Sequence, residues 1–217
     1  MTPRAIVFDA YGTLFDVRAV VLQHGHDLGV DADGLAALWR QRQLEYTWLV
    51  SLMGRYEDFW SLTTAALHSA ARELHIELTD NQRDGLLQSY LSAPLFAEVN
   101  AALDSLNEFR LAILSNGSPD MLAAAVRAGG LTSVFSEVIS IDGAQVYKPS
   151  PRAYALGPEI LKVRLEDILF VSSNWWDVWG AKSFGFNVCW CNRSDTAVDF
   201  TPDLVVTGLD QIAPRLA

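Results

Sequence analysis

The stretch that decides the fold is Ala5-Ile6-Val7-Phe8-Asp9-Ala10-Tyr11-Gly12-Thr13-Leu14-Phe15. Its first four residues are apolar without alternation, which predicts a short strand buried on both faces. The strand delivers the carboxylate of Asp9 to its end, and Gly12 follows in a turn that can bend sharply. An aspartate carried from a buried strand into such a loop is a candidate nucleophile. Two residues later, where an acid/base partner would stand, the chain has Tyr11.

Three more apolar runs also end in small polar residues. They are 111–114 before Ser115-Asn116-Gly117, 168–171 before Ser172-Ser173-Asn174, and 188–191 before Asn192. Shorter strands are expected at 138–139 and 204–206, and helical patterns at 119–128, 151–161 and 176–184. Ser150 and Pro151 resemble a helix N-cap followed by proline in the first turn. This order predicts an α/β fold with a doubly wound, Rossmann-like parallel sheet, whose ligands bind beyond the carboxyl ends of the strands.

About ninety residues separate the first two core strands, too many for one crossover. Apolar residues keep helical spacing at Leu35, Leu38, Trp39, Leu49, Leu52 and Met53, and again at Phe59, Leu62, Ala66 and Leu67. We therefore expect residues 17–92 to form an inserted, mostly helical cap subdomain, with residues 1–16 and 93–217 forming the core. A helical insertion that leaves directly after the Asp9 loop is placed to cover the site and exclude water.

Charge and composition narrow the range of partners. The 217 residues carry a formal net charge of −10, which argues against nucleic acid or an anionic membrane surface as a partner. An anionic small substrate would need local cations inside the site. No run of eighteen apolar residues occurs, so neither a signal peptide nor a spanning helix is expected. Cys189 and Cys191 would point to opposite faces of one strand and cannot pair, which favours a reduced, cytoplasmic protein.

The polar strand ends occur in a fixed order along the chain. Asp9 comes first, Ser115-Asn116 second, Lys148-Pro149 third, and the segment from Ser172 to Asp177 last. This ordered set resembles the haloacid dehalogenase superfamily, and the resemblance covers the whole chain. It implies a Rossmann-like core with Asp9 as the nucleophile.

Within that superfamily, phosphatases carry a second aspartate two positions after the nucleophile and an acidic pair that holds Mg²⁺. Here the corresponding positions are Tyr11 and Ser173, and only Asp177 remains of the pair. These losses, with the helical segment from Trp39 to Tyr46, resemble the L-2-haloacid dehalogenase branch. The resemblance implies hydrolysis of short L-2-haloalkanoic acids and haloacetates to 2-hydroxy acids with inversion, through an aspartyl ester on Asp9. It implies no metal and no cofactor, because a halide leaves without a proton.

The resemblance also implies roles for individual residues. Lys148 would keep Asp9 ionised, and Arg40 and Asn116 would receive the halide beside an apolar wall at Phe59. Thr13, Ser115 and the backbone amides of the Asp9 loop would orient Asp9 and the substrate carboxylate. Ser172, Asn174 and Asp177 would position the hydrolytic water, with Tyr154 holding Lys148 and Asp177 in register. The substrate pocket would also include Tyr11, Leu44 and Trp176, and the family suggests a homodimer.

Other readings stay open at this level. Asp9 is otherwise a strand-end cap, Lys148 a surface lysine and Tyr154 a packing residue. Arg40, with Arg42 close by, is otherwise a solvated helix charge. Trp175, where the family tends to have a small residue, either shrinks the pocket, which would favour haloacetates, or turns outward. His24 and His26 are either surface residues or metal ligands. A Mg²⁺-dependent phosphatase and a non-catalytic binding protein using the same cleft are the alternative functions, and no G-x-S-x-G elbow supports a serine hydrolase.

Overall fold

The centre of the structure is a six-stranded parallel sheet. The computed structural model describes residues 3–28 and 31–216, without the side chains of 25–28. The strands lie in the order β3-β2-β1-β4-β5-β6, and every neighbouring pair is parallel. Their bounds are β1 Ala5–Phe8, β2 Arg110–Ser115, β3 Glu137–Ser140, β4 Ile168–Ser172, β5 Asn187–Cys191 and β6 Leu204–Val206. The predicted doubly wound sheet is confirmed, and each apolar run forms the expected strand.

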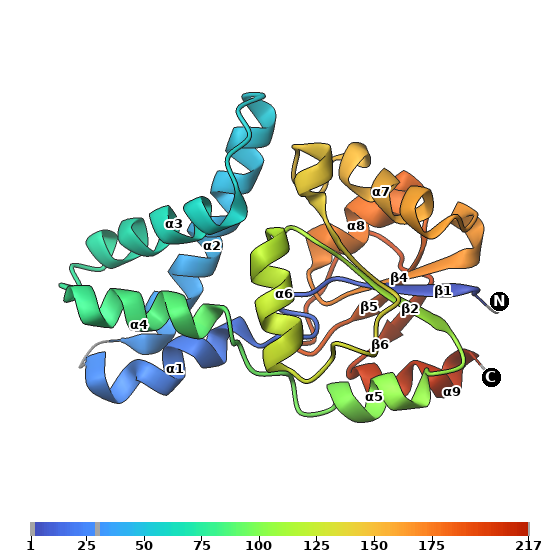
Figure 1. The fold of residues 1–217 in the computed structure, drawn as a ribbon, viewed down its shortest axis with the longest axis horizontal. Helices are drawn as coiled ribbons and strands as arrows, with labels where there is room; N and C mark the ends of the chain where they lie inside the picture. Colours follow the sequence, from blue (N-terminus) through green and yellow to red (C-terminus); the bar gives the residue numbers. More distant parts are fainter. Residues whose placement is uncertain (1–2, 29–30, 217) are drawn as a thin grey trace.

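Helices cover both faces of this sheet. Figure 1 shows α7 (Pro151–Leu161) and α8 (Trp175–Phe184) on one side, and α5 (Val99–Ser105) and α9 (Ala213–Leu216) on the other. The core also contains α6 (Pro119–Ala128). Both α6 and α7 have the predicted bounds, whereas α8 begins at Trp175, one residue earlier than predicted. Ser150 does precede α7, but its side chain makes no capping hydrogen bond. Of the two helix-start features predicted at this position, the structure therefore has only the proline in the first turn.

Four helices between β1 and α5 form a separate layer beyond the carboxyl ends of the strands (Figure 1). They are α1 (Val17–Leu28), α2 (Ala32–Leu52), α3 (Phe59–Glu73) and α4 (Asp80–Tyr90), and we call them the cap helices. Side chains of Asp31, Asp58 and Thr79 cap the starts of α2, α3 and α4. These bonds satisfy backbone N–H groups that the first turn leaves free. Within the described residues, no helix is both long and apolar enough to span a membrane.

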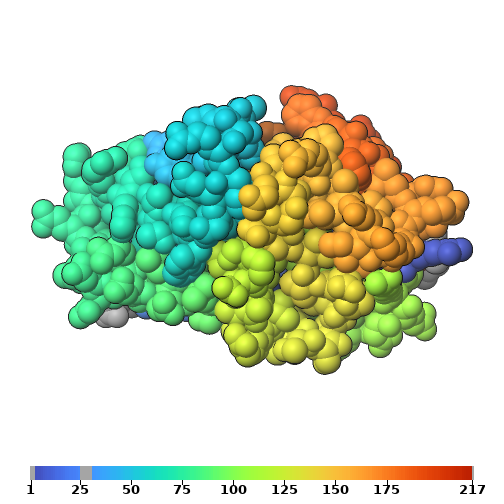
Figure 2. Space-filling view, turned by 45° about the horizontal axis from the view of Figure 1, so that its top comes forward, coloured from blue at the N-terminus to red at the C-terminus, as the bar shows by residue number. Residues whose placement is uncertain are grey.

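The chain enters and leaves the cap helices through two adjacent segments. The Asp16 amide donates to the Pro94 carbonyl at 2.7 Å, and the Phe96 amide donates to the Leu14 carbonyl at 3.1 Å. At the opposite side of the site, the Tyr147 hydroxyl donates to the Glu57 carbonyl at 2.7 Å. Figure 2 shows the cyan α2–α3 region against the yellow part of the core. The cap helices are therefore closed over the strand ends.

The apolar pattern of α2 was only partly a guide to burial. Leu35 and Trp39 are buried, as are the α3 residues Phe59, Leu62, Ala66 and Leu67. Leu49, Leu52 and Met53, which continue the same helical spacing, are exposed instead, Leu52 by 85%. The last turn of α2 lies at the junction of cap and core, where Leu52 borders an open cavity that Tyr147 also lines, so its apolar side chain is left largely uncovered.

Candidate active site

The site lies where the strand order of the sheet reverses, between β1 and β4. Asp9 follows β1 and Asn174 follows β4, and these two strands are paired. Ligand sites of doubly wound folds occur at this switch point. Gly12 has a φ of +90°, and a Cβ at this position would lie 3.4 Å from the Asn174 Oδ1 atom. A glycine therefore lets the nucleophile loop bend closely against the loop after β4.

Lys148 lies between two carboxylates in the interior. Its Nζ is 3.1 Å from Asp9 Oδ1 and 3.1 Å from Asp177 Oδ2, and the lysine side chain is fully buried. The ammonium also lies 4.8 Å from the centre of the Phe170 ring. Burying a single lysine would be costly, but two carboxylates and an aromatic face compensate its charge. The surface-lysine reading is thus wrong, because Lys148 is the central cation of the site.

Asp177 is held by Lys148 on one oxygen and by Tyr154 on the other. The Tyr154 hydroxyl donates to Asp177 Oδ1 at 2.8 Å. Burial raises the pKa of Asp177 to about 6, against the lowering effect of Lys148, and Asp9 raises it further. Burial and the neighbouring Asp177 also raise the pKa of Tyr154, so this hydroxyl stays a donor. Tyr154 therefore has a polar contact inside the site in addition to its packing.

The second oxygen of Asp9 accepts two side-chain hydrogen bonds. Asn174 Nδ2 donates to Oδ2 at 2.8 Å, and the Thr13 hydroxyl donates at 3.2 Å. Thr13 also accepts a bond from the Ser173 amide at 2.9 Å and lies 3.5 Å from the Ser172 hydroxyl. With Lys148 on Oδ1, the carboxylate of Asp9 has donors on both oxygens and is only 5% exposed. This carboxylate is held in one orientation within the interior by donors on both oxygens, which a strand-end cap does not require.

Ser115 and Asn116 bring β2 to the same edge of the sheet. Asn116 is buried, and its Oδ1 accepts a bond from the Lys148 amide at 3.1 Å. Ser115 Oγ accepts from the Gly117 amide at 3.2 Å, which fixes the turn after the strand. Neither side chain contacts Asp9 directly within the described residues. Asn116 Nδ2 makes no hydrogen bond among the described residues, so this amino group is available to a ligand.

Arg40 extends from α2 to the nucleophile loop, and Arg42 does not. Arg40 Nη2 donates to the Tyr11 carbonyl at 3.1 Å, and Nη1 donates to Gln43 Oε1 at 2.6 Å. Arg42 instead pairs with Glu45 and Glu73 on the outer surface. Of these two arginines, Arg40 therefore lies beside the nucleophile loop and Arg42 lies on the outer surface.

Aromatic side chains line the cap side of the site. The Tyr11 ring stacks on Phe59 with centroids 6.1 Å apart, and both side chains are buried. Leu44 is half-buried and lies one turn after Arg40 on the same face of α2. Trp176 from α8 meets Trp48 from α2 edge to face at 5.7 Å. Burial raises the pKa of the Tyr11 hydroxyl, so this side chain is an apolar wall with a neutral phenol.

Two site residues were missed by the sequence analysis. Gln43 is completely buried in the cap and accepts from Arg40. Arg193, which follows β5, donates to the Thr13 carbonyl at 3.0 Å, to Ser173 Oγ at 2.7 Å and to Glu98. The sequence does contain a signal for Arg193, because it directly follows an apolar strand, as the predicted site residues at the other strand ends do. Gln43 offered no comparable signal, because a glutamine within a polar helix stretch usually faces water.

The donor set does not fit a Mg²⁺ ion of the kind that phosphatases of this fold hold. Mg²⁺ prefers an octahedral shell of oxygen ligands, anchored by carboxylates. Asp9 Oδ1 and Asp177 Oδ2 both face the Lys148 ammonium. The Ser173 hydroxyl, at the position of the missing acid, accepts from the Arg193 guanidinium. A divalent ion there would lie between two fixed cations, so these residues are unsuited to it.

Trp175 is 45% exposed and packs against Trp179 on the outer surface of α8. The Trp175 side chain is turned outward and does not narrow the pocket. The structure therefore gives no support to the interpretation that Trp175 makes the pocket selective for haloacetates. His24 Nε2 lies 2.7 Å from Ser89 Oγ, and the side chain of His26 is outside the described residues. Across those residues, no group of three histidine, cysteine or acidic side chains could hold a metal.

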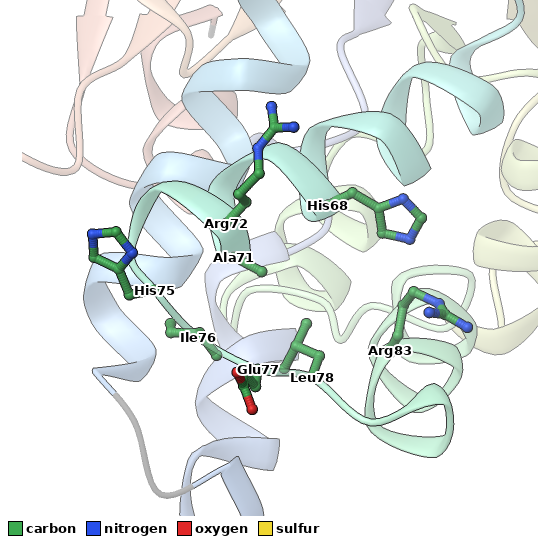
Figure 3. A pocket seen from close by; sticks show the side chains of 8 residues that line it. All are labelled: His68, Ala71, Arg72, His75, Ile76, Glu77, Leu78 and Arg83. Carbon is green, nitrogen blue, oxygen red and sulfur yellow. The ribbon is translucent and has the colours of Figure 1, made fainter.

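One cavity of the structure borders the site, and another is separate from it. One of about 410 Å³ is lined by Trp48, Tyr147 and Lys148 and lies at the junction of cap and core. Another, of about 580 Å³, opens on the outer surface of the cap between His68 and Arg83. Figure 3 shows that its side chains come from the end of α3, the following loop and α4. The second cavity contains none of the predicted site residues.

Comparison with known proteins agrees with this geometry. A family model for haloacid dehalogenase-like hydrolases matches residues 3–185. (S)-2-haloacid dehalogenase 1 of Pseudomonas sp. (strain CBS-3) is 45% identical over 200 residues, which cover 91% of this chain and 88% of that protein. Haloacetate dehalogenase H-2 of Moraxella sp. (strain B) is 43% identical over 218 residues, covering 98% of this chain and 97% of that protein.

Solved structures give the same result. The L-2-haloacid dehalogenase of Xanthobacter autotrophicus superposes with a TM-score of 0.90 at 39% identity, covering 99% of this chain and 98% of that one. The same enzyme with chloropropionic acid covalently bound gives a TM-score of 0.89 at 38% identity, with the same coverage. Fold and sequence agree with these proteins over nearly the full length. This chain therefore belongs to the haloacid dehalogenase superfamily, in its L-2-haloacid dehalogenase family.

Proposed function

We propose that this protein hydrolyses L-2-haloalkanoic acids and haloacetates to 2-hydroxy acids, through an ester formed on Asp9. The observation that carries the proposal is the buried carboxylate of Asp9, with Lys148 3.1 Å from one oxygen and Asn174 2.8 Å from the other. A carboxylate kept ionised yet withdrawn from water is a suitable nucleophile for a halogenated carbon. The covalently bound chloropropionic acid in the Xanthobacter enzyme supports the same route.

In the first step, one Asp9 oxygen attacks C2 from the side opposite to the halogen. A carbon–oxygen bond forms, and the carbon–halogen bond breaks with its electron pair leaving on the halide. The configuration at C2 inverts once. The halide leaves without a proton, so a phenol wall at Tyr11, in place of an acid, does not impede the step.

In the second step, water adds to the carbonyl carbon of the Asp9 ester. The ester bond at that carbon breaks, so C2 keeps the oxygen that came from Asp9 and the aspartate gains the oxygen of water. One proton of the water goes to the alcohol, and the other is released. We assign the role of base to Asp177 and the positioning of the water to Ser172 and Asn174.

The substrate anion would be held by groups that the fold leaves available. Arg40 and Asn116 would receive the halide, with Phe59 and Leu44 as apolar neighbours. The backbone N–H groups of Ala10 and Tyr11 make no hydrogen bond within the described part of the chain. We assign them to the substrate carboxylate, next to Ser115.

Boundaries and assembly follow as further parts of the proposal. We take residues 17–92 as the cap subdomain and residues 1–16 and 93–217 as the core. The exposed apolar turn of Leu49, Leu52 and Met53 supports a homodimer, which light scattering on a sizing column would detect. Cys189 and Cys191 are buried free thiols, which supports a reducing compartment such as the cytoplasm.

The alternative function is phosphate ester hydrolysis with Mg²⁺. Release of chloride from chloroacetate and from both 2-chloropropionate enantiomers, measured with EDTA or Mg²⁺, separates the two. Chloride release from chloroacetate and the L-enantiomer, unaffected by EDTA, is the expected result. Phosphate release that requires Mg²⁺, without chloride release, would overturn the proposal.

A further inference from the structure

Gln43 is a fully buried polar side chain that the mechanism above does not use. It lies on α2 with no exposed surface. Its Oε1 accepts from Arg40 Nη1 at 2.6 Å and from the Tyr90 hydroxyl at 3.0 Å. Its Nε2 donates to Thr63 Oγ1 at 2.6 Å. Every polar atom of the amide is thus used, and these contacts define which end is oxygen and which is nitrogen.

The hydrogen bonds around Gln43 run in one direction. Arg40 and Tyr90 donate to Gln43, Gln43 donates to Thr63, and the Thr63 hydroxyl donates to the Phe59 carbonyl at 2.6 Å. This series of hydrogen bonds connects α2, α3 and α4. A fully satisfied buried network of this kind fixes the orientation of its members. Arg40 is therefore oriented by the interior of the cap.

The two arginines of α2 differ in how their charge is compensated. Arg42 is paired with the carboxylates of Glu45 and Glu73. Among the described residues, the hydrogen-bond partners of Arg40 are neutral oxygens: those of Gln43, the Tyr11 carbonyl and the Tyr90 hydroxyl. A neutral acceptor orients a guanidinium without cancelling its charge, whereas a carboxylate does both. The charge of Arg40 thus remains available for an anion.

From this contrast we infer that Gln43 is a positioning residue, which aims Arg40 at the leaving halide while leaving the guanidinium uncompensated. The inference rests on the proposed function, because it presumes that a halide departs toward Arg40. It explains why an amide stands here: a carboxylate of the same size would neutralise the cation that the departing halide needs. Stabilisation of charge that develops in the transition state then depends on a group that never touches the substrate.

The test compares Gln43→Glu with Gln41→Glu, a matched control. Gln41 lies on the same helix, is exposed and bonds to Glu45, so its substitution adds the same charge without reaching Arg40. We expect Gln43→Glu to lower kcat/KM for chloroacetate by at least about tenfold, or about 1.4 kcal/mol. The loss should be smaller for bromoacetate, because bromide is the better leaving group and needs less stabilisation. Gln41→Glu should leave both values unchanged.

A double substitution separates action through Arg40 from damage to the cap. In an Arg40→Met background, Gln43→Glu should cause no further loss, since non-additivity marks residues that act through one another. Gln43→Met, which removes the acceptor without adding charge, should fall between wild type and Gln43→Glu. Thermal unfolding of each variant shows whether it is folded.

Three results would overturn the inference. Equal losses for chloroacetate and bromoacetate would indicate a purely structural role, and so would an undiminished loss in the Arg40→Met background. A Gln43→Glu enzyme as active as Gln41→Glu would also contradict it. If wild-type protein released no halide at all, the proposed function would fail instead, and the two failures are therefore distinguishable.

Discussion

Replacing Lys148 with methionine removes the cation of the site but keeps much of its aliphatic volume. Each of its two carboxylate partners lies 3.1 Å from Nζ. At an effective dielectric constant near 20, one such pair interacts by about 5 kcal/mol. Protonating an ordinary carboxyl at pH 7 costs about 4 kcal/mol. The interaction lost with the lysine thus exceeds the free-energy cost of protonation. At least one carboxyl of the variant therefore takes up a proton and does not remain an unpaired buried charge.

Asp177 is the carboxyl that takes up this proton. It has no exposed surface, whereas Asp9 is 5% exposed, and burial has already raised the pKa of Asp177 to about 6. Asp9 keeps its hydrogen bonds from Asn174 and Thr13 on Oδ2. The Lys148→Met enzyme should consequently retain a nucleophile but lose its base. We expect turnover at pH 7 to fall at least about a hundredfold, or about 2.7 kcal/mol, with the loss in ester hydrolysis.

The assay is chloride release from chloroacetate, combined with intact-protein mass spectrometry during turnover. Accumulation of the carboxymethyl ester in Lys148→Met, together with a lower urea midpoint, is the expected result, because breaking a buried ion pair costs about 3–5 kcal/mol. Lys182→Met is the control, since this lysine pairs with Asp203 at the amino ends of β5 and β6, opposite the site. Turnover within tenfold of wild type, or an unchanged urea midpoint, would refute the reasoning.

Three further predictions concern other groups of the site. Because burial raises the pKa of Asp177 from 3.8 to about 6, the folded protein retains a proton that the unfolded chain releases. Its contribution to the free energy of unfolding should therefore fall by about 3 kcal/mol as pH rises from about 4 to 6. Urea unfolding should show this dependence weakened in Asp177→Asn, and kcat of the wild type should decline below about pH 6. Arg40→Lys should lose most chloride release, since a single ammonium nitrogen on a shorter side chain does not reproduce the two guanidinium nitrogens that donate to Gln43 and to the loop. Arg42→Gln should keep chloride release, and equal losses in the two variants would contradict the geometry. Trp175→Ala should leave the ratio of kcat/KM for chloroacetate and 2-chlorobutyrate unchanged, because the ring faces outward; a shift toward 2-chlorobutyrate would contradict this.

Much of the fold could be predicted from the sequence, because parallel strands that are buried on both faces have continuous runs of apolar residues. The same rule located Asp9, Ser172 and Asn174, since carboxyl ends of parallel strands share one edge of the sheet. Lys148 stands in a loop, and only the family resemblance pointed to it. Its pairing with two carboxylates became visible once β1, α8 and this loop were brought together.

Other features depend on contacts that no local pattern encodes. Helical periodicity grouped Leu52 with the apolar face of α2, but periodicity does not say where a covering neighbour ends. From the sequence alone, Gln43 is expected to face water. Its burial depends on α3 and α4, which bond its side chain through Thr63 and Tyr90. Arg193 binds Thr13 across 180 positions of sequence. Such residues are predicted poorly because their environment is supplied entirely by distant segments.

The central claim, that Asp9 forms and then loses an ester, is tested most directly by a single turnover in ¹⁸O-labelled water with enzyme in excess of substrate. The account predicts that ¹⁸O appears in the peptide containing Asp9 and that the 2-hydroxy acid is unlabelled, because its new oxygen comes from the aspartate. Label in the first product, with none in Asp9, would show direct attack by water and contradict the account.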